Sequence, residues 1–236
     1  MKDRAVPRYE TDRRTNVVVV IAAYNEARVI GDVVRAVLAD GWPVVVVDDG
    51  SVDQTFERLA QLPVWRLRHI VNRGQGAALQ TGIRHALSLG AEVVVTFDAD
   101  GQHDPSQIID IVEPVASGRC DVAMGSRFLD GNSQVPFGRY LVLKLGVLFT
   151  RVTTGIRVTD THNGFRAFSR EAAERLSIVM DRMAHGSDIL EQVARHRWRF
   201  CEIPVTIKYT AYSIAKGQRS GNALRIAIQV LLEKMR

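Results

Sequence analysis

The chain has 236 residues, of which 46% are hydrophobic, and a formal net charge of +5. This composition supports a buried core and excludes disorder except at the ends, and one large α/β domain is as consistent with it as two small ones. The charge is uneven, because residues 195–236 contain nine Lys and Arg against two Glu (+7) and the remainder carries −2. A basic end suits an anionic partner.

The sequence gives no sign of export or of a membrane span. Residues 1–16 are charged and lack the apolar centre of a signal peptide, which favours a solvated tail. The longest apolar candidate, "LVLKLGVLF", is short and interrupted by Lys144, whereas a span needs about 20 residues. Cys120 and Cys201 are far apart in the sequence without a metal-ligand spacing, so we expect reduced core residues rather than a disulfide or a zinc site, and a cytoplasmic protein.

Strand and helix signals alternate through the first half of the chain. β-branched runs predict strands at 17–23, 44–49, 64–71 and 92–98, and the segments between them have helical periodicity. A further strand is expected at 120–126, after a helix that Pro105 opens and Gly118 closes. This βαβ pattern predicts an α/β fold with a mostly parallel, Rossmann-like sheet and helices on both faces.

The second half is less regular. We expect helices at 138–155 and 186–198 and a late strand at 201–209. One domain is predicted over 17–220, followed by an amphipathic helix at 221–236 whose stripe is Leu224, Ile228, Leu231 and Met235. The sequence leaves open whether that stripe packs on the sheet, lies on an anionic membrane or small membrane partner, or pairs with a second copy in a homo-oligomer.

Polar clusters follow each of the first four predicted strands, at 24–26, 48–51, 72–76 and 98–102. In a parallel sheet these carboxyl ends share one edge, which is where ligands bind. A tripeptide such as Asp49-Gly50-Ser51 is, by itself, more often a turn with a helix cap. The glycines at 74 and 76 follow the third strand, so they give little support to a Rossmann dinucleotide site.

The segment "VVTFDADGQHDP" carries the strongest chemical signal. In extended backbone, Asp98 and Asp100 point the same way and Ala99 faces away. Two such carboxylates raise each other's pKa unless a cation lies between them. Oxygen ligands of this kind suit Mg²⁺ or Mn²⁺, which would also bind a diphosphate.

The order of these clusters resembles the family 2 glycosyltransferases of the GT-A fold. The motifs are "VVIAAYNE", "VVVVDDGSVDQT", "NRGQGAALQTGI" and "TFDADGQHDP", and the resemblance runs from about Val17 to Lys216. "MGSRF", "TDTHNGFRAFSR" and "EIPVTIKYTAYSIAKGQ" are most similar to polyprenyl-phosphate sugar synthases of the dolichol-phosphate-mannose type. Two departures are Ala22, where the family commonly has proline, and the missing transmembrane helices that many relatives carry.

The resemblance implies a nucleotide-diphosphate sugar donor and a divalent metal. It implies metal ligation by Asp98, Asp100 and Gln102 and neutralisation of leaving-group charge by Arg127. Lys216, in the loop-like "SIAKGQRSGN", is either a solvated lysine or a residue that closes over the pyrophosphate. The donor-binding set that it implies is Ala22, Tyr24, Glu26, Asp48, Asp49, Gly76, Asp98, Ala99, Asp100 and Lys216.

The acceptor has two interpretations. A sugar hydroxyl needs a general base, for which the resemblance offers Asp188, whereas a lipid phosphate needs only cations beside an apolar surface, such as Arg139 and Lys144. Neither chemistry requires His162 or His185.

We therefore expect a metal-dependent inverting hexosyltransferase that acts on polyprenyl phosphate from a UDP- or GDP-sugar at the cytoplasmic membrane face. The alternatives are a saccharide hydroxyl acceptor, in cell-surface polysaccharide synthesis, and a nucleotide-sugar-binding protein without catalysis. No aromatic-rich basic motif supports nucleic-acid binding.

Overall fold

A computed structural model describes residues 16–129, 137–178 and 185–208. The solvated tail predicted at 1–16 falls almost entirely outside these ranges. The amphipathic helix predicted at 221–236 lies wholly outside them. No helix among the described residues is both long and apolar enough to cross a bilayer.

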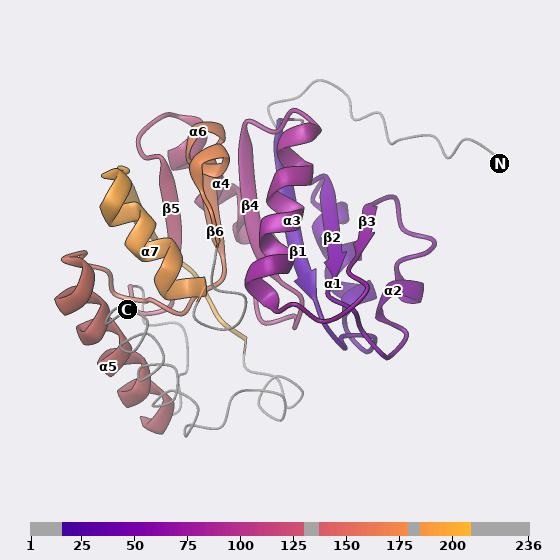
Figure 1. The fold of residues 1–236 in the computed structure, drawn as a ribbon, viewed down its shortest axis with the longest axis horizontal. Coiled ribbons are helices and arrows are strands. Elements are labelled where there is room, and N and C mark those ends of the chain that lie inside the picture. The colour runs from indigo at the N-terminus through magenta and orange to yellow at the C-terminus, as the bar shows by residue number, and fades with distance from the viewer. Residues whose placement is uncertain (1–15, 130–136, 179–184, 209–236) are drawn as a thin grey trace.

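One seven-stranded sheet organises the molecule, in the order β3-β2-β1-β4-β6-β5-β7 (Figure 1). All neighbouring pairs are parallel except those of β6, which runs antiparallel to both β4 and β5. The predicted mostly parallel α/β sheet is therefore confirmed. The strands are β1 Val17–Ala23, β2 Val44–Asp48, β3 Trp65–Arg68, β4 Val93–Asp98, β5 Val122–Ser126, β6 Arg166–Ser169 and β7 Phe200–Pro204.

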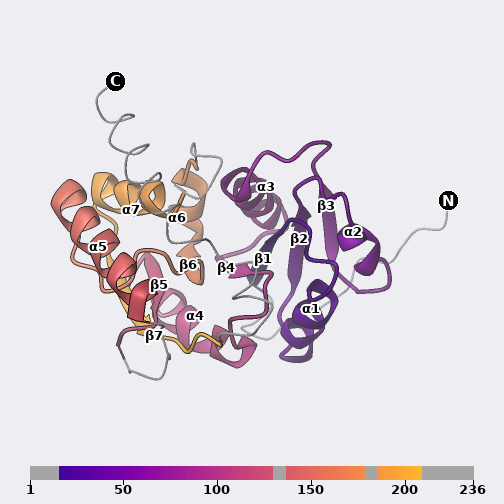
Figure 2. The same ribbon diagram turned by 90° about the horizontal axis from the view of Figure 1, so that it is seen from below.

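Helices cover both faces of this sheet, as the βαβ pattern predicts. In Figure 2, α1 and α4 lie on one side, and α3, α6 and α7 lie on the other. The fifth helix, α5, lies beyond the β5–β7 end of the sheet and packs against α7. The helices are α1 Ile30–Ala39, α2 Thr55–Arg58, α3 Gln75–Ser88, α4 Ile108–Ala116, α5 Phe137–Thr154, α6 Arg170–Arg175 and α7 His185–His196.

The central strands are buried on both faces, which explains their continuous runs of valine. Successive side chains of a strand point to opposite faces, so Val19 and Ile21 join the core under α1 and α4, while Val18 and Val20 join the core under α3. At the end of β4, Ala99 is buried in the first of these cores.

The structure corrects several predicted boundaries. The third strand spans only Trp65–Arg68 instead of 64–71, because the chain leaves the sheet at His69. The helix expected from Pro105 begins as a short 3₁₀ turn, Pro105–Gln107, before α4. The late strand is in the ladder only as far as Pro204, although Ile207 forms an isolated bridge with His103.

Two elements were not predicted. β6 has four residues, too few for a periodic signal, and it follows the turn-rich "DTHNG". α6 is also short, and it begins at Ser169, whose hydroxyl accepts a hydrogen bond from the amide of Ala172.

The packing of α3 on the sheet requires glycine at position 82. An added Cβ there would lie 2.3 Å from Val20 Cγ1 and 3.2 Å from Val47 Cγ2, both on buried strands. We expect Gly82→Ala to lower the free energy of unfolding by roughly 1–3 kcal/mol, measured by urea denaturation.

The matched control is Gly31→Ala in α1. Its added Cβ would meet only the flexible side chain of Arg35, at 3.4 Å, and alanine favours a helix over glycine. We expect this variant to be at least as stable as the parent. Equal effects of the two substitutions would contradict the proposed clash between α3 and the sheet.

Candidate active site

The strand register brings the polar clusters to one edge of the sheet. β1 lies between β2 and β4, and Ala22 pairs with Asp98 while Ala23 pairs with Asp48. The loops that follow these three strands therefore leave the sheet side by side. The predicted convergence of the first, second and fourth clusters is confirmed.

Hydrogen bonds join the loop after β1 to the loop after β2. The amide of Asn25 donates to Ser51 Oγ (2.9 Å), and the amide of Glu26 donates to Thr55 Oγ1 (2.8 Å). In return, the amide of Val52 donates to Asn25 Oδ1 (3.0 Å). These bonds fix the position of Tyr24, which remains 41% exposed at the edge.

The two carboxylates of "DDGS" are buried and act as acceptors for the loops. Asp48 accepts from the amide of Ser51 (3.1 Å) and pairs with Arg68 Nε (3.1 Å). Asp49 accepts from the amide of Gly74 (2.7 Å), and its other oxygen lies 2.7 Å from His69 Nδ1. The structure thus places both residues in the loop framework, and their predicted contact with the donor stays a prediction.

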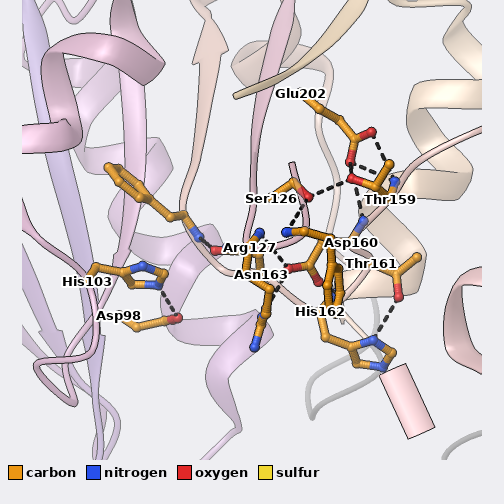
Figure 3. A network of polar contacts seen from close by, with 12 residues as sticks. Asp98, His103, Ser126, Arg127, Thr159, Asp160, Thr161, His162, Asn163 and Glu202 are labelled. Carbon is orange, nitrogen blue, oxygen red and sulfur yellow. Dashed lines mark hydrogen bonds and ion pairs between the residues drawn. The ribbon is translucent and has the colours of Figure 1, made fainter. Parts of the chain in front are cut away.

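Asp98 lies at the centre of the edge, at the end of β4. Asp98 Oδ1 is 3.2 Å from Gln75 Nε2. Asp98 Oδ2 is 3.0 Å from His103 Nε2 (Figure 3). The backbone of Gly164 closes over the same carboxylate, because an added Cβ there would lie 2.5 Å from Asp98 Oδ1. The neighbouring Gly76, a predicted donor-binding residue, is buried in the first turn of α3.

Asp100 is the least compensated acid of the site. Within the described part of the chain it accepts one hydrogen bond, from the amide of Gln102 (3.0 Å). Burial and then the charge of Asp98 raise its pKa to about 6, with a smaller contribution from Glu26. No ready-made cluster of three His, Cys, Asp or Glu ligands is present among the residues that the structure describes.

A second polar network lies beside Asp98, at the carboxyl end of β5. Arg127 Nε is 2.6 Å from Asp160 Oδ2, and both side chains are buried (Figure 3). Glu202 on β7 accepts from the amide and the hydroxyl of Thr159, each at 2.8 Å. The structure therefore brings Arg127 to the correct edge, in an ion pair with Asp160.

The predicted acceptor residues lie on α5. Lys144 Nζ is 4.2 Å from the ring centre of Phe128, the residue after Arg127, and 5.5 Å from that of Tyr140. The backbone of Arg139 is in the first turns of the helix, and its side chain is outside the described set. On the same helix Leu145, Leu148 and Val152 are 57%, 56% and 77% exposed, in a stripe spaced as i, i+3 and i+7.

The remaining predicted residues divide between α7 and the undescribed part of the chain. Asp188 is in the first turn of α7, where it accepts from Gln192 Nε2 (2.9 Å). Lys216 and the side chain of His185 lie outside the described residues. His162 lies near Asp160, with Nδ1 2.7 Å from Thr161 Oγ1, and a Cβ at Gly146 of α5 would touch its ring.

Sequence reasoning missed the residues that hold the predicted ones. Four of them lie inside quoted motifs and His69 lies three residues before one, but none was assigned a role, because their contacts join segments distant in the chain. Arg166 on the unpredicted β6 is also among them, since its guanidinium donates to the carbonyls of Thr161 and Asn163. The others are His69, Gln75, Gly164 and Glu202.

The fold is an α/β sheet with acidic loops gathered at one edge, and sequence comparison identifies the class of protein as a glycosyltransferase. The chain belongs to glycosyl transferase family 2, whose model matches residues 18–177. It is 32% identical over 239 residues to the UDP-N-acetylglucosamine–dolichyl-phosphate N-acetylglucosaminyltransferase of Methanococcus voltae, covering 92% of this chain and 95% of that one.

A second relative supports the same family, and a solved structure shares the fold. The polyprenol monophosphomannose synthase of Mycolicibacterium smegmatis is 29% identical over 226 residues, covering 89% of this chain and 83% of its own. Glucosyl-3-phosphoglycerate synthase of Mycobacterium tuberculosis, crystallised with Mn²⁺ and UDP-glucose, superposes with a TM-score of 0.70 at 19% identity, over 91% and 76% of the two chains. The GT-A fold and the resemblance to polyprenyl-phosphate sugar synthases are thus confirmed.

Because the pKa of Asp100 is raised in the folded protein, ionised Asp100 should lower the free energy of unfolding at neutral pH. The unfolded chain loses this proton near 3.8 and the folded chain near 6, so the folded state is penalised once pH rises through this window. We expect Asp100→Asn to be more stable than the parent above pH 6, by at most about 3 kcal/mol, and equal to it in acid. Thermal unfolding of the metal-free protein across pH measures this difference.

Asp104→Asn is the matched control of opposite sign. A hydrogen bond from Lys208, followed by one from Ser106, lowers the pKa of Asp104, so this carboxylate stabilises the fold above its ordinary pKa and less as pH falls. Its substitution should reduce stability at neutral pH, by a small amount because the pair is exposed. A destabilised Asp100→Asn at pH 8 would contradict the assigned repulsion.

Proposed function

We propose that this glycosyltransferase moves a hexose from a nucleotide-diphosphate sugar to a polyprenyl phosphate, with inversion and with the help of Mg²⁺ or Mn²⁺. The observation that carries the proposal is the pair of acids Asp98 and Asp100 at the end of β4, with Glu26 of the loop after β1 nearby. Burial, then the charge of Asp98 and to a smaller extent that of Glu26, raise the pKa of Asp100 to about 6. The segment 160–164 links these acids to α5, an apolar helix that bears the cation Lys144. A Cβ at Gly164 would touch Asp98, and a Cβ at Gly146 of α5 would touch His162.

The residues at the end of β4 fit a divalent cation. They are hard oxygen donors with uncompensated negative charge, and the carbonyl-bearing side chain of Gln102 stands beside them. Asp98, Asp100 and Gln102 would hold the ion, which when bound would neutralise the donor's diphosphate. Gln75, His103 and the backbone at Gly164 keep the Asp98 carboxylate in place.

Other residues orient the donor and its leaving group. The exposed ring of Tyr24 offers a surface for the nucleoside, next to the loops that Asp48 and Asp49 hold together. Arg127 would add positive charge on the side of the leaving phosphate, with its guanidinium held by Asp160. The base and the sugar are left open in the proposal, because the two named relatives carry different sugars in their names.

A lipid phosphate is the acceptor that best suits α5. Such a phosphate is already ionised, so it needs no general base, only a cation near an apolar surface. Lys144 supplies the cation and Leu145, Leu148 and Val152 supply an exposed apolar stripe, which favours a peripheral position at the inner face of the cell membrane. The names of the two relatives, which act on dolichyl phosphate or make a polyprenol phosphosugar, support the same acceptor class.

The metal assignment predicts loss of turnover without loss of fold. Asp98→Asn and Asp100→Asn should each abolish sugar transfer and metal-dependent donor binding, because the cation loses a charged ligand. Radiolabelled transfer and calorimetry with UDP- and GDP-sugars measure the two effects, and circular dichroism checks the fold. Full activity in either variant, or activity that a chelator leaves unchanged, would disprove metal dependence.

The acceptor assignment is tested by comparing a variant of the proposed phosphate-binding cation with a variant of the alternative general base. Lys144→Ala should raise the apparent KM for polyprenyl phosphate at least several-fold while sparing slow hydrolysis of the nucleotide sugar. Asp188→Asn should change the chemical step little, whereas a hydroxyl acceptor would lose a factor of about 10²–10⁴ without its base. Arg151→Ala, an exposed cation on the same helix, is the control for general charge loss.

The outcome also separates the lipid acceptor from a saccharide. Under the proposal, the labelled product partitions into organic solvent with the lipid. A folded Asp188→Asn variant that binds donor but is inactive, together with a normal Lys144→Ala variant, would replace the lipid phosphate by a saccharide hydroxyl.

A further inference from the structure

The fold brings the two cysteines of the chain into contact. Cys120 and Cys201 are 81 residues apart in the sequence, and their Sγ atoms are 2.6 Å apart. Cys201 lies in β7, which pairs in parallel with β5, and Cys120 lies two residues before β5 begins. Both thiols are free in this structure.

This contact is closer than unbonded sulfur atoms pack. A thiol is only a weak donor, so an S–H···S hydrogen bond does not account for such an approach. A disulfide is about 2.05 Å long, so the two sulfurs need to close by only about half an ångström to become bonded. The ladder between β5 and β7 holds the backbone of Cys201, and the amide of Cys120 donates to the carbonyl of Pro114 (3.1 Å).

We propose that Cys120 and Cys201 are a thiol modification site, at which exchange with a low-molecular-weight disulfide forms an intramolecular disulfide bond. This inference is independent of the glycosyltransferase function, and it departs from the sequence-based expectation of two unconnected core thiols.

The environment of the two sulfurs assigns the order of the exchange. The contact with Cys120, with help from the nearby Arg119, lowers the pKa of Cys201, whereas the contact with Cys201 and burial raise the pKa of Cys120. Cys201 is also the more accessible of the two. Cys201 is therefore the nucleophile, and Cys120 resolves the mixed disulfide.

The reaction balances without any group from the active site. The Cys201 thiolate attacks one sulfur of the small disulfide and releases one thiolate. Cys120 then loses its proton and attacks Cys201 Sγ, which releases the second. The protein loses two electrons and two protons, and the small disulfide becomes two thiols.

The bond would tie β7 covalently to the segment that precedes β5. Beyond β7 the chain reaches the loop that follows β4, because Ile207 bridges to His103 and the amide of Lys208 donates to the carbonyl of Gln102 (2.8 Å). The disulfide therefore fixes the strand that leads to this loop.

The test uses the full chain, incubated with increasing ratios of oxidised to reduced glutathione and then alkylated under denaturing conditions. We expect both thiols to disappear together in the monomer, the intact mass to fall by two hydrogen atoms, and a peptide pair joining Cys120 to Cys201 to appear after proteolysis. The melting temperature of the oxidised protein should rise by roughly 5–10 °C, and a reductant should reverse the rise.

Cys120→Ala and Cys201→Ala are the matched controls. With Cys120 replaced, the remaining Cys201 should accumulate a stable glutathione adduct; with Cys201 replaced, the buried Cys120 should stay unmodified. In the parent, free thiols that persist in excess oxidised glutathione, a stable adduct on Cys201, or a cross-link between two chains would each overturn the proposal. An intramolecular bond without any rise in melting temperature would overturn the role assigned to it in fixing β7.

Discussion

Buried and half-buried carboxylates that accept hydrogen bonds from neighbouring loops hold this molecule together at the carboxyl edge of its sheet. Asp49 joins the loop after β2 to the start of α3, and Glu202 joins β7 to the segment that carries Asp160. Removing a carboxylate from water without hydrogen-bond partners costs free energy. Each of these carboxylates accepts hydrogen bonds from backbone amides of another segment, and so it links the two segments. The active site is therefore a set of loops fastened to one another by charge.

Asp100 differs from these acids because it has fewer partners. The difference separates carboxylates that hold loops together from a carboxylate that is available to a ligand. Asp48, Asp49 and Asp160 are matched by cations or by several donors, whereas Asp100 has the amide of Gln102 and the charge of Asp98 beside it. An acid that the protein leaves unmatched is available to a ligand. The same contrast appears on α5, where an apolar stripe is exposed instead of being packed against the core.

The sequence predicts those parts of the fold that local residue patterns specify. The valine runs fix the central strands to within a residue or two, and motif order places Asp98 and Asp100 on the same edge as Tyr24. β6 escaped prediction because its four residues are specified by pairing with β4 and β5. Likewise, the supports of the site, such as His69 for Asp49 and Gly164 for Asp98, depend on contacts between distant segments that no local period encodes.

The position of Glu202 gives the site an order of assembly. Its carboxylate reaches back 43 residues to Thr159, and Lys208 reaches back 104 residues to Asp104. Both contacts use residues in or after β7, the last strand of the described chain, so they form only once β7 has been synthesised. As the chain leaves the ribosome, β1, β2 and β4 emerge before β7, so the loops around Asp48 and Asp98 have the means to assemble before the network of Arg127, Asp160 and Glu202 is complete.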